Sequence, residues 1–413
     1  MYSLDVLNRW RAPRRQGESV SPTVWSLGFT SLFTDISSEM VSSILPIYFL
    51  TQLGLSPLQF GFVDGLYQGV TAFSRIASGF FADRWRKHKE TALIGYALSA
   101  FCKPAFLLVG NAWGALAALI AIDRTGKGIR TAPRDALISL HSVKSNLGAS
   151  FGVHRALDAV GAVVGPGTAF LILAKVPGAY DVIFIVSFCI ALIGLGVLAL
   201  FVENRPAESA NASLTVVSLK TALRLVGNKR FRFLLIFGGL LSIATMSDSF
   251  IYLGMQHQMT LANPFFPMLY LGTSLFYVAF AIPFGRLADQ TSRMAVFIGG
   301  HFLLLGVYTA PLLTHAGRLQ LVLYLALFGA YYAATDGVLM ALAADVLPSH
   351  LCASGLALLT TITNVARLLS SVMAGWLWTR GAYFTALVFL VGLVAVIGFF
   401  LIALGFKRSY ADA

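Results

Sequence analysis

The sequence predicts an all-α membrane protein with twelve transmembrane helices, arranged as two six-helix, pseudo-symmetric halves. Hydrophobic residues make up 57 % of the chain and charged residues 12 %, which is about half of the charged share found in soluble domains. Three long stretches, 182–202, 294–317 and 381–406, contain no Asp, Glu, Lys or Arg. Each is long enough to cross a bilayer, because a spanning helix needs about 20 apolar residues.

A repeated motif indicates that the chain contains two similar halves. Residues 79–87 read Gly-Phe-Phe-Ala-Asp-Arg-Trp-Arg-Lys, and residues 285–293 read Gly-Arg-Leu-Ala-Asp-Gln-Thr-Ser-Arg. In both copies, Gly-x-x-x-Asp lies at the end of a hydrophobic stretch and is followed by one or more basic residues. The two aspartates, Asp83 and Asp289, are 206 residues apart in a chain of 413. We therefore expect a helix bundle that has been duplicated.

Hydrophobic stretches and the polar turns between them define the expected helices. In the half from 22 to 202 we expect helices at about 22–51, 56–82, 89–110, 113–141, 146–174 and 178–202. In the half from 230 to 407 we expect them at about 230–256, 264–288, 293–314, 319–346, 351–378 and 382–407. The run 249–285 is also free of charge, but Asn263-Pro264 interrupts it, and proline rarely continues a helix.

Residues 203–229 are expected to form a cytoplasmic linker between the halves. They begin Glu-Asn-Arg-Pro, continue with small polar residues and become amphipathic at 219–226. This last run predicts a short helix on the membrane surface, where Lys220 and Arg224 can meet lipid phosphates.

The positive charges predict the orientation of the chain. The net charge is +12, and with a cytoplasmic N-terminus nineteen of the 30 Lys and Arg residues fall in cytoplasmic segments or at cytoplasmic helix ends. Only Lys175, Arg318 and Arg380 fall on the other side. This positive-inside pattern predicts a multi-pass protein of the bacterial cytoplasmic (inner) membrane, with the tails 1–21 and 408–413 both in the cytoplasm. It accounts for the basic charge without a nucleic-acid partner, and residues 1–21 lack the apolar core of a cleaved signal peptide.

Two local patterns resemble motifs of the major facilitator superfamily. The first is Gly79-x-x-x-Asp83-Arg84 between the second and third helices, with a degenerate copy between the eighth and ninth. The second is an arginine four residues before a glycine on the fourth helix, here Arg124 and Gly128. The resemblance covers about 22–407 and implies a twelve-helix transporter whose central cavity is lined by the first, fourth, seventh and tenth helices.

A third pattern of the same family concerns the direction of transport. The fifth helix carries Gly-x-x-x-Gly-Pro at 161–166, which in this family is associated with exporters that exchange substrate for protons. The chain departs from the family at two places. Residues 169–170 are Ala-Phe where the motif closes with two glycines, and Arg86 replaces the second glycine of the first motif.

Charged residues within the membrane are the expected proton-coupling residues, because each costs at least about 2.5 kcal/mol at a helix centre. Asp35 and Glu39 are four residues apart and share one face of the first helix. Their mutual repulsion favours proton binding near neutral pH. Asp248 and Asp336 lie on the seventh and tenth helices, which line the cavity in the resembled fold. The alternative is that each carboxylate forms a structural ion pair with an arginine of a neighbouring helix.

Basic and aromatic side chains are the expected substrate contacts. Asp123 and Lys127 are four residues apart and can pair, which leaves Arg124 free to bind a carboxylate or phosphate through its planar fork. Alternatively, Arg124 holds a carboxylate of another helix, and the tyrosines serve only in packing. The expected substrate-binding residues are Arg124, Lys127, Arg75, Lys103, Tyr67, Tyr252 and Tyr332.

The motif residues are expected to control opening and closing. The Asp83 carboxylate, at a cytoplasmic helix end, can meet the positive N-terminus of a helix in the other half. Small residues four apart allow close helix packing, and proline permits a bend; ordinary packing is the alternative. The expected gating residues are Gly79, Asp83, Arg84, Gly285, Asp289, Gly161, Gly165 and Pro166.

Together these expectations describe a secondary active transporter that exports a small organic solute by proton antiport and alternating access. The alternative is a proton-coupled importer of an organic anion, because seven of the eight intramembrane basic residues lie in the first half. A transport-dead sensor or a membrane enzyme is a remote alternative, since no nucleophile and base are arranged for catalysis. We expect a monomer in the lipid bilayer that uses substrate and protons, with no cofactor, no metal and no nucleotide-binding loop.

Overall fold

The computed structural model describes residues 20–85, 87–143, 146–203, 225–312, 317–348 and 351–409. Side chains are described for all of these except 72–85, 311, 353–354 and 403–409. The expected linker at 203–229, with its amphipathic run at 219–226, therefore lies mostly outside the described residues.

The first half, called the N half, consists of helices α2 to α8. Its long helices are α2 (Pro22–Ser42), α4 (Pro57–Trp85), α5 (His88–Val109), α6 (Trp113–Leu140), α7 (Leu147–Lys175) and α8 (Tyr180–Phe201). After α2 the chain continues through the short helix α3 (Leu45–Ile47) and the π-helical turn η1 (Tyr48–Gln52). A proline occupies the first turn of α2, α3 and α4, where its missing N–H has no partner to lose.

The second half, called the C half, consists of helices α10 to α17. These are α10 (Lys229–Ala244), α11 (Asp248–Gln258), α12 (Pro267–Gln290), α13 (Arg293–Tyr308), α14 (Arg318–Thr335), α15 (Val338–Val346), α16 (Cys352–Trp378) and α17 (Ala382–Ser409). Because α10 with α11, and α14 with α15, are the two parts of broken helices, this half also makes six crossings. The predicted all-α fold of twelve helices is confirmed.

The two breaks differ from the uninterrupted helices expected at 230–256 and 319–346. Between α10 and α11, Thr245 has φ −92° and ψ 107°, which is extended backbone. Between α14 and α15, Asp336 is extended and Gly337 has a φ of 79°, a left-handed conformation that glycine adopts without steric cost. An aspartate lies at each break, Asp248 as the first residue of α11 and Asp336 just after α14.

Within the described residues, eight helices are long and apolar enough to cross a membrane. Two of the remaining helices, α13 and α6, are not in this group, for different reasons. The apolar helix α13 has only 16 residues, and α6 contains the charged residues Asp123, Arg124, Lys127, Arg130, Arg134 and Asp135. Charged residues at membrane depth commonly face a bundle interior or a cavity, so α6 is a helix of the interior.

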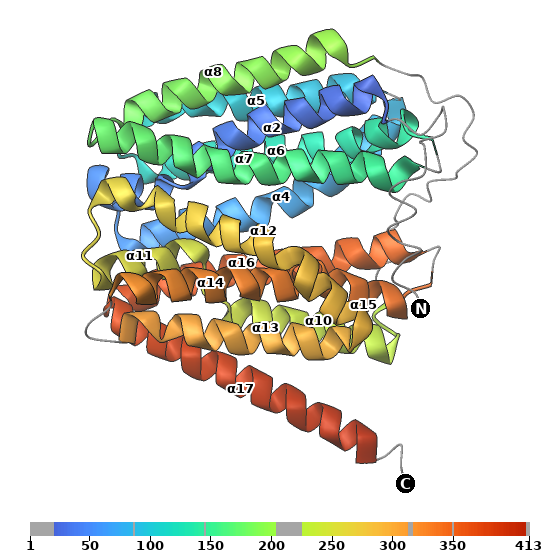
Figure 1. Ribbon diagram of the computed structural model, residues 1–413, viewed down its shortest axis with the longest axis vertical. Helices are drawn as coiled ribbons and strands as arrows, with labels where there is room; N and C mark the ends of the chain where they lie inside the picture. Colours follow the sequence, from blue (N-terminus) through green and yellow to red (C-terminus); the bar gives the residue numbers. More distant parts are fainter. Residues whose placement is uncertain are drawn as a thin grey trace, which may run out of the picture.

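The two halves lie side by side along the long axis of the molecule (Figure 1). The helix α2 begins, α8 ends and α10 begins at one end of the bundle, which we call the linker end; α4 begins and α16 ends at the opposite end, which we call the far end (Figure 1). The halves meet where α4 packs against α16 and α7 against α12.

The packing of α4 against α16 is close at the far end. A Cβ atom at Gly61 of α4 would lie 2.6 Å from the carbonyl oxygen of Ser371 and 2.9 Å from the Cα of Gly375, both on α16. Only glycine permits such an approach between two backbones. The rings of Phe60 and Phe250, with centroids 5.2 Å apart, extend this contact from α4 to α11.

Candidate functional site

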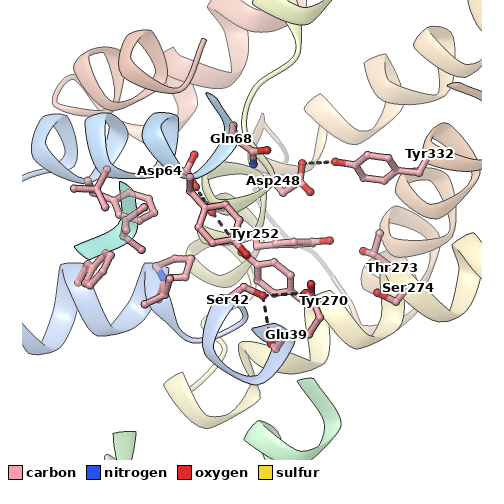
Figure 2. A pocket seen from close by; sticks show the side chains of 18 of the residues that line it. Glu39, Ser42, Asp64, Gln68, Asp248, Tyr252, Tyr270, Thr273, Ser274 and Tyr332 are labelled. Atoms are coloured by element: carbon pink, nitrogen blue, oxygen red, sulfur yellow. Dashed lines mark hydrogen bonds between the residues drawn. The ribbon is translucent and has the colours of Figure 1, made fainter. Parts of the chain in front are cut away.

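A cavity of about 350 Å³ lies between the two halves. Its walls come from α2, α3, α4 and α6 of the N half and from α11, α12 and α14 of the C half (Figure 2). Among the described side chains that line it, the acidic ones are the four carboxyl groups of Glu39, Asp64, Asp248 and Asp336, and the one basic side chain is that of Lys127. Five tyrosines also line it: Tyr67, Tyr252, Tyr270, Tyr277 and Tyr332.

Asp64 joins the N half to the C half at the wall of this cavity. Its carboxylate, on α4, is only 7 % exposed and accepts three hydrogen bonds from serine hydroxyls of the C half. Oδ2 is 2.5 Å from Ser247 Oγ and 2.6 Å from Ser371 Oγ, and Oδ1 is 2.8 Å from Ser249 Oγ. Among the described side chains, no Lys, Arg or His forms an ion pair with it.

The aspartates at the two helix breaks each face a tyrosine hydroxyl. Tyr332 of α14 donates a hydrogen bond of 2.5 Å to Oδ1 of Asp248 (Figure 2). Tyr277 of α12 donates one of 3.4 Å to Oδ2 of Asp336. Asp248 is also the first residue of α11, where the helix dipole stabilises negative charge. Asp248 and Asp336, two of the four expected coupling residues, both line the cavity.

Asp35 and Glu39 have different surroundings, although they share a face of α2. Glu39 lines the cavity, and its Oε2 accepts a hydrogen bond of 2.9 Å from Ser42 (Figure 2). Asp35 is not among the residues that line the cavity, and its Oδ1 is 3.7 Å from Nη2 of Arg130. The geometry thus gives Asp35 the interhelical ion pair that the alternative interpretation expected, while Glu39 faces the cavity.

The expected pair between Asp123 and Lys127 is wrong. Asp123 instead accepts hydrogen bonds from Nε and Nη2 of Arg124, the first of 2.8 Å. Asp123 faces α5, where Ser99 Oγ is 2.6 Å from its Oδ1 and Lys103 Nζ is 3.5 Å from it. Asp123 is therefore directed toward α5, whereas Lys127 lines the main cavity.

Arg124 and Lys103 therefore belong to a buried ion cluster beside the main cavity. Each is less than 5 % exposed, and neither lines the main cavity. The guanidinium carbon of Arg124 lies 3.9 Å from the ring centroid of Tyr67, and Tyr67 does line the cavity. Of the expected substrate-binding residues, the structure brings Lys127, Tyr67, Tyr252 and Tyr332 to the cavity wall. The side chain of Arg75 lies outside the described part of the chain.

The glycines of the fifth-helix motif hold α7 against α2. A Cβ atom at Gly161 would lie 2.9 Å from Cβ of Asp35, and one at Gly165 would lie 2.8 Å from Cβ of Glu39. Pro166 follows inside α7. These contacts are internal to the N half, and they position the two turns of α2 that carry the carboxylates.

The second copy of the loop motif forms an ion network within the C half. Asp289 at the end of α12 is 3.1 Å from Arg293, whose other nitrogen is 2.6 Å from Asp345 of α15. Gly285 and Asp289 line a further cavity of about 210 Å³ beside this network. In the first copy, Gly79, Asp83 and Arg84 lie in α4, but their side chains are outside the described part, so the gating role of Asp83 stays a prediction.

Sequence reasoning did not predict that Asp64 and three serines would join the two halves at the cavity wall. Asp64 was visible as a charge at membrane depth, but the second helix was not expected to line the cavity. Ser247 and Ser249 flank Asp248 in a polar cluster on the seventh helix. Nothing in the sequence indicated that they would meet Asp64, because that contact depends on how the two halves pack.

A second cavity, of about 240 Å³, lies inside the C half. Its lining includes Arg367 and Asn364 of α16 and His301 of α13. Among the described side chains, none forms an ion pair with Arg367. Tyr332 and Asp336 line both this cavity and the main one, so the two spaces are adjacent.

The described His, Cys, Asp and Glu residues include no group of three placed to hold a metal ion. The described lining of the main cavity offers carboxylates, hydroxyls, an amide, tyrosine rings and one ammonium group. Such a lining can exchange protons and can bind a small solute through hydrogen bonds and ring contacts.

Comparison with known proteins identifies the family. Residues 27–273 match the Major Facilitator Superfamily. The chain is also 31 % identical, over 366 residues, to an uncharacterised MFS-type transporter of Methanocaldococcus jannaschii, covering 87 % of this chain and 89 % of that protein. The chain belongs to the major facilitator superfamily. It is therefore a multi-pass membrane transporter and not an enzyme, as the sequence motifs predicted.

Solved structures of the superfamily share the fold at low sequence identity. A mutant of the nucleoside transporter NupG superposes with a TM-score of 0.80 at 14 % identity, covering 92 % of this chain and 99 % of that one. A POT family transporter in complex with 5-aminolevulinic acid superposes with a TM-score of 0.73, also at 14 % identity, covering 94 % and 96 %. These likenesses show that the chain shares the fold of these transporters.

Proposed function

We propose that this transporter exports a small organic solute in exchange for protons, and that the cavity between the halves is its solute site. The observation that carries the proposal is the charge of the described lining, four carboxylates against one ammonium group. Carboxylates at membrane depth are costly unless they are paired or functional. All four, Glu39, Asp64, Asp248 and Asp336, accept hydrogen bonds from serine or tyrosine hydroxyls and form no ion pair among the described side chains.

The same lining favours a solute with amine or hydroxyl groups. A cationic or hydroxyl-rich solute can satisfy the carboxylates, and the five tyrosines supply rings for its apolar or cationic parts. The named solutes of the two solved relatives, a nucleoside and 5-aminolevulinic acid, carry such groups. A cavity of about 350 Å³ suits a solute of similar size, since small-molecule sites begin at about 300 Å³.

The direction and orientation of transport are supported by the sequence. The Gly161, Gly165 and Pro166 pattern resembles that of proton-coupled exporters, and its glycines position the α2 turns that carry Asp35 and Glu39. The distribution of Lys and Arg supports a cytoplasmic linker end. On this orientation, residues 203–229 form a cytoplasmic linker between the halves 22–202 and 230–407.

Proton coupling can be tested with purified protein in liposomes that contain a pH-sensitive dye. A nucleoside, 5-aminolevulinic acid, D-xylose and an organic cation are suitable probes. We expect a solute with an amine or several hydroxyls to move protons, and vesicles of the two orientations to show which direction is favoured. Solute transport that persists unchanged when a protonophore collapses the proton gradient would contradict the proposal.

A second candidate function, import of an organic anion, is favoured by Arg367. Its guanidinium lines the second cavity beside Tyr332 and Asp336, and such a group binds carboxylate or phosphate through paired N–H donors. If the solute is an anion, Arg367→Lys should weaken its binding by about tenfold or more. If the solute is a cation or neutral, the same variant should leave affinity nearly unchanged.

A further inference from the structure

We propose that Asp64 is a proton-dependent latch that holds the two halves together at the far end. This inference rests on the proposed proton coupling, and it names a residue outside the carboxylates of the first, seventh and tenth helices. When ionised, Asp64 closes the far end by accepting three hydrogen bonds from the C half. When it binds a proton, the latch weakens and the far end opens.

The geometry shows that Asp64 is the centre of a contact between halves. Its three donors come from two separate segments, Ser247 and Ser249 at the break between α10 and α11, and Ser371 in α16. The Ser371 hydroxyl also lies 3.0 Å from the carbonyl oxygen of Gly61. One carboxylate of the N half thus fixes both the helix break and α16 of the C half.

The packing around Asp64 leaves no room for a looser arrangement. One turn before it, Gly61 meets the backbone of Ser371; one residue after it, a Cβ atom at Gly65 would lie 2.9 Å from the carbonyl oxygen of Leu368. A further turn along, a Cβ atom at Gly69 would lie 2.8 Å from Cδ1 of Leu368. Because backbones touch on both sides of Asp64, its hydroxyl partners are held in position while the far end is closed.

A proton can reach Asp64 because its residue lines the main cavity. The charged groups that line this cavity with it are Glu39 of α2, Lys127 of α6, Asp248 of α11 and Asp336 after α14, and Tyr67 of α4 and Tyr270 of α12 line it too. Tyr270 lies within 3.4 Å of the Ser249 hydroxyl. The described lining of the cavity therefore includes three further carboxylates and one ammonium group, and none of the described basic side chains forms an ion pair with Asp64.

Proton binding changes what the Asp64 carboxyl group can do. The ionised form is an acceptor only and suits three hydroxyl donors, and hydrogen bonds to an ionised group are the stronger kind. The protonated form has one O–H donor, so at least one serine must give up its bond or turn its own hydroxyl around. All the remaining bonds are then between neutral groups. Proton uptake from the cavity thus weakens the contact between the two halves, while the helices themselves stay folded.

The test measures the distance between spin labels at the far end, in protein whose native cysteines have been replaced. Suitable label positions are Gln52, the last residue of η1, and Thr379, just after α16; both are exposed. In the wild type we expect acidic pH to increase the population with a long distance. Asp64→Asn should raise that population about tenfold, which is the effect of losing one charge-assisted hydrogen bond, and should remove its dependence on pH.

Two serine variants of α16 provide a matched comparison if Asp64→Asn does not fold. Ser371→Ala removes a donor to Asp64, whereas Ser370→Ala removes a hydroxyl that donates to the carbonyl oxygen of Thr245 at 2.6 Å, inside the C half. Both serines are buried. We expect Ser371→Ala to open the far end and Ser370→Ala to leave it as in the wild type. Equal distances in Ser371→Ala and the wild type at every pH, or equal opening in both serine variants, would overturn the latch.

The same proteoliposomes separate this inference from the proposed function. If the labels respond to pH as expected but no solute moves protons, the latch stands and proton-coupled transport fails. If solutes move protons while the labels ignore pH in the wild type, transport is coupled through other carboxylates and the latch fails.

Discussion

Gly165 of α7 lies so close to α2 that a methyl group in its place would be 2.8 Å from the Cβ atom of Glu39 and 2.7 Å from the carbonyl oxygen of Ile36. The glycine of the exporter-like motif thus fixes the depth of a carboxylate in the main cavity. A resemblance that was drawn from sequence letters alone acquires a physical meaning, because the motif sets the position of a carboxylate that lines the cavity.

The first prediction is that Gly165→Ala impairs proton-coupled transport by displacing α2. Overpacking of this kind costs about 1–3 kcal/mol, so the melting temperature should fall while solute-driven proton movement falls further. Gly152→Ala on the same helix is the matched control, because nothing lies within 4 Å of a Cβ atom there. That variant should be neutral or slightly more stable, since alanine is a better helix former. Equal loss of transport in both variants would argue against a role for the α7–α2 contact.

The twelve helices could be predicted from the sequence because a membrane span has a strong physical signature. About 20 apolar residues are needed in each case, and most expected ranges match the helices to within a few residues. The first and ninth helices end earlier than expected, at Ser42 and Tyr308 in place of 51 and 314. The breaks in the seventh and tenth helices were not predicted. Thr245 and Asp336 are compatible with a continuous helix on propensity alone, and only Gly337, with its left-handed φ of 79°, offered a local reason for a break.

For the candidate site, the charged residues could be predicted from the sequence, but their pairing could not. A charged residue in a membrane span is costly and therefore rare. This criterion identified Glu39, Asp248, Asp336 and Lys127 from the sequence. Which charge pairs with which depends on the rotation and depth of neighbouring helices. Sequence spacing therefore favoured Lys127 as the partner of Asp123, although Asp123 faces α5 and pairs with Arg124.

The second prediction concerns the buried cluster of Asp123. Arg124→Gln should lower stability strongly, because removal of one partner of a buried ion pair costs about 3–5 kcal/mol. Asp123→Asn combined with Arg124→Gln should recover part of that loss, since a neutral amide then replaces the buried carboxylate that lost its guanidinium partner. Thermal unfolding of the two single variants and the double variant measures the coupling. Solute affinity should change little in any variant that folds, and a large loss of affinity at full stability would return Arg124 to the solute site.

The third prediction concerns orientation in the membrane. Single cysteines at Asn228, beside the start of α10, and at Thr260, after α11, lie at opposite ends of the bundle and are exposed. The positive-inside distribution predicts that a membrane-impermeant maleimide added to intact cells labels the cysteine at 260 and not the one at 228. Both should react after the cells are lysed, which controls for accessibility. Labelling of only the cysteine at 228 in intact cells would reverse the orientation, and with it the proposed direction of transport.

The last prediction separates the two carboxylates of the first helix. Glu39 lines the cavity, whereas Asp35 is 3.7 Å from Arg130 and does not line it. Glu39→Gln should therefore abolish solute-driven proton movement while leaving part of the solute binding, because the amide keeps the shape of the side chain but cannot exchange a proton. Asp35→Asn should chiefly reduce stability, since it leaves the buried guanidinium of Arg130 without its carboxylate. Proton movement and melting temperature are measured for both variants in the same preparation. Full loss of proton movement in Asp35→Asn at unchanged melting temperature, with Glu39→Gln still active, would instead make Asp35 the coupling residue, and would require that a proton reach it past Arg130.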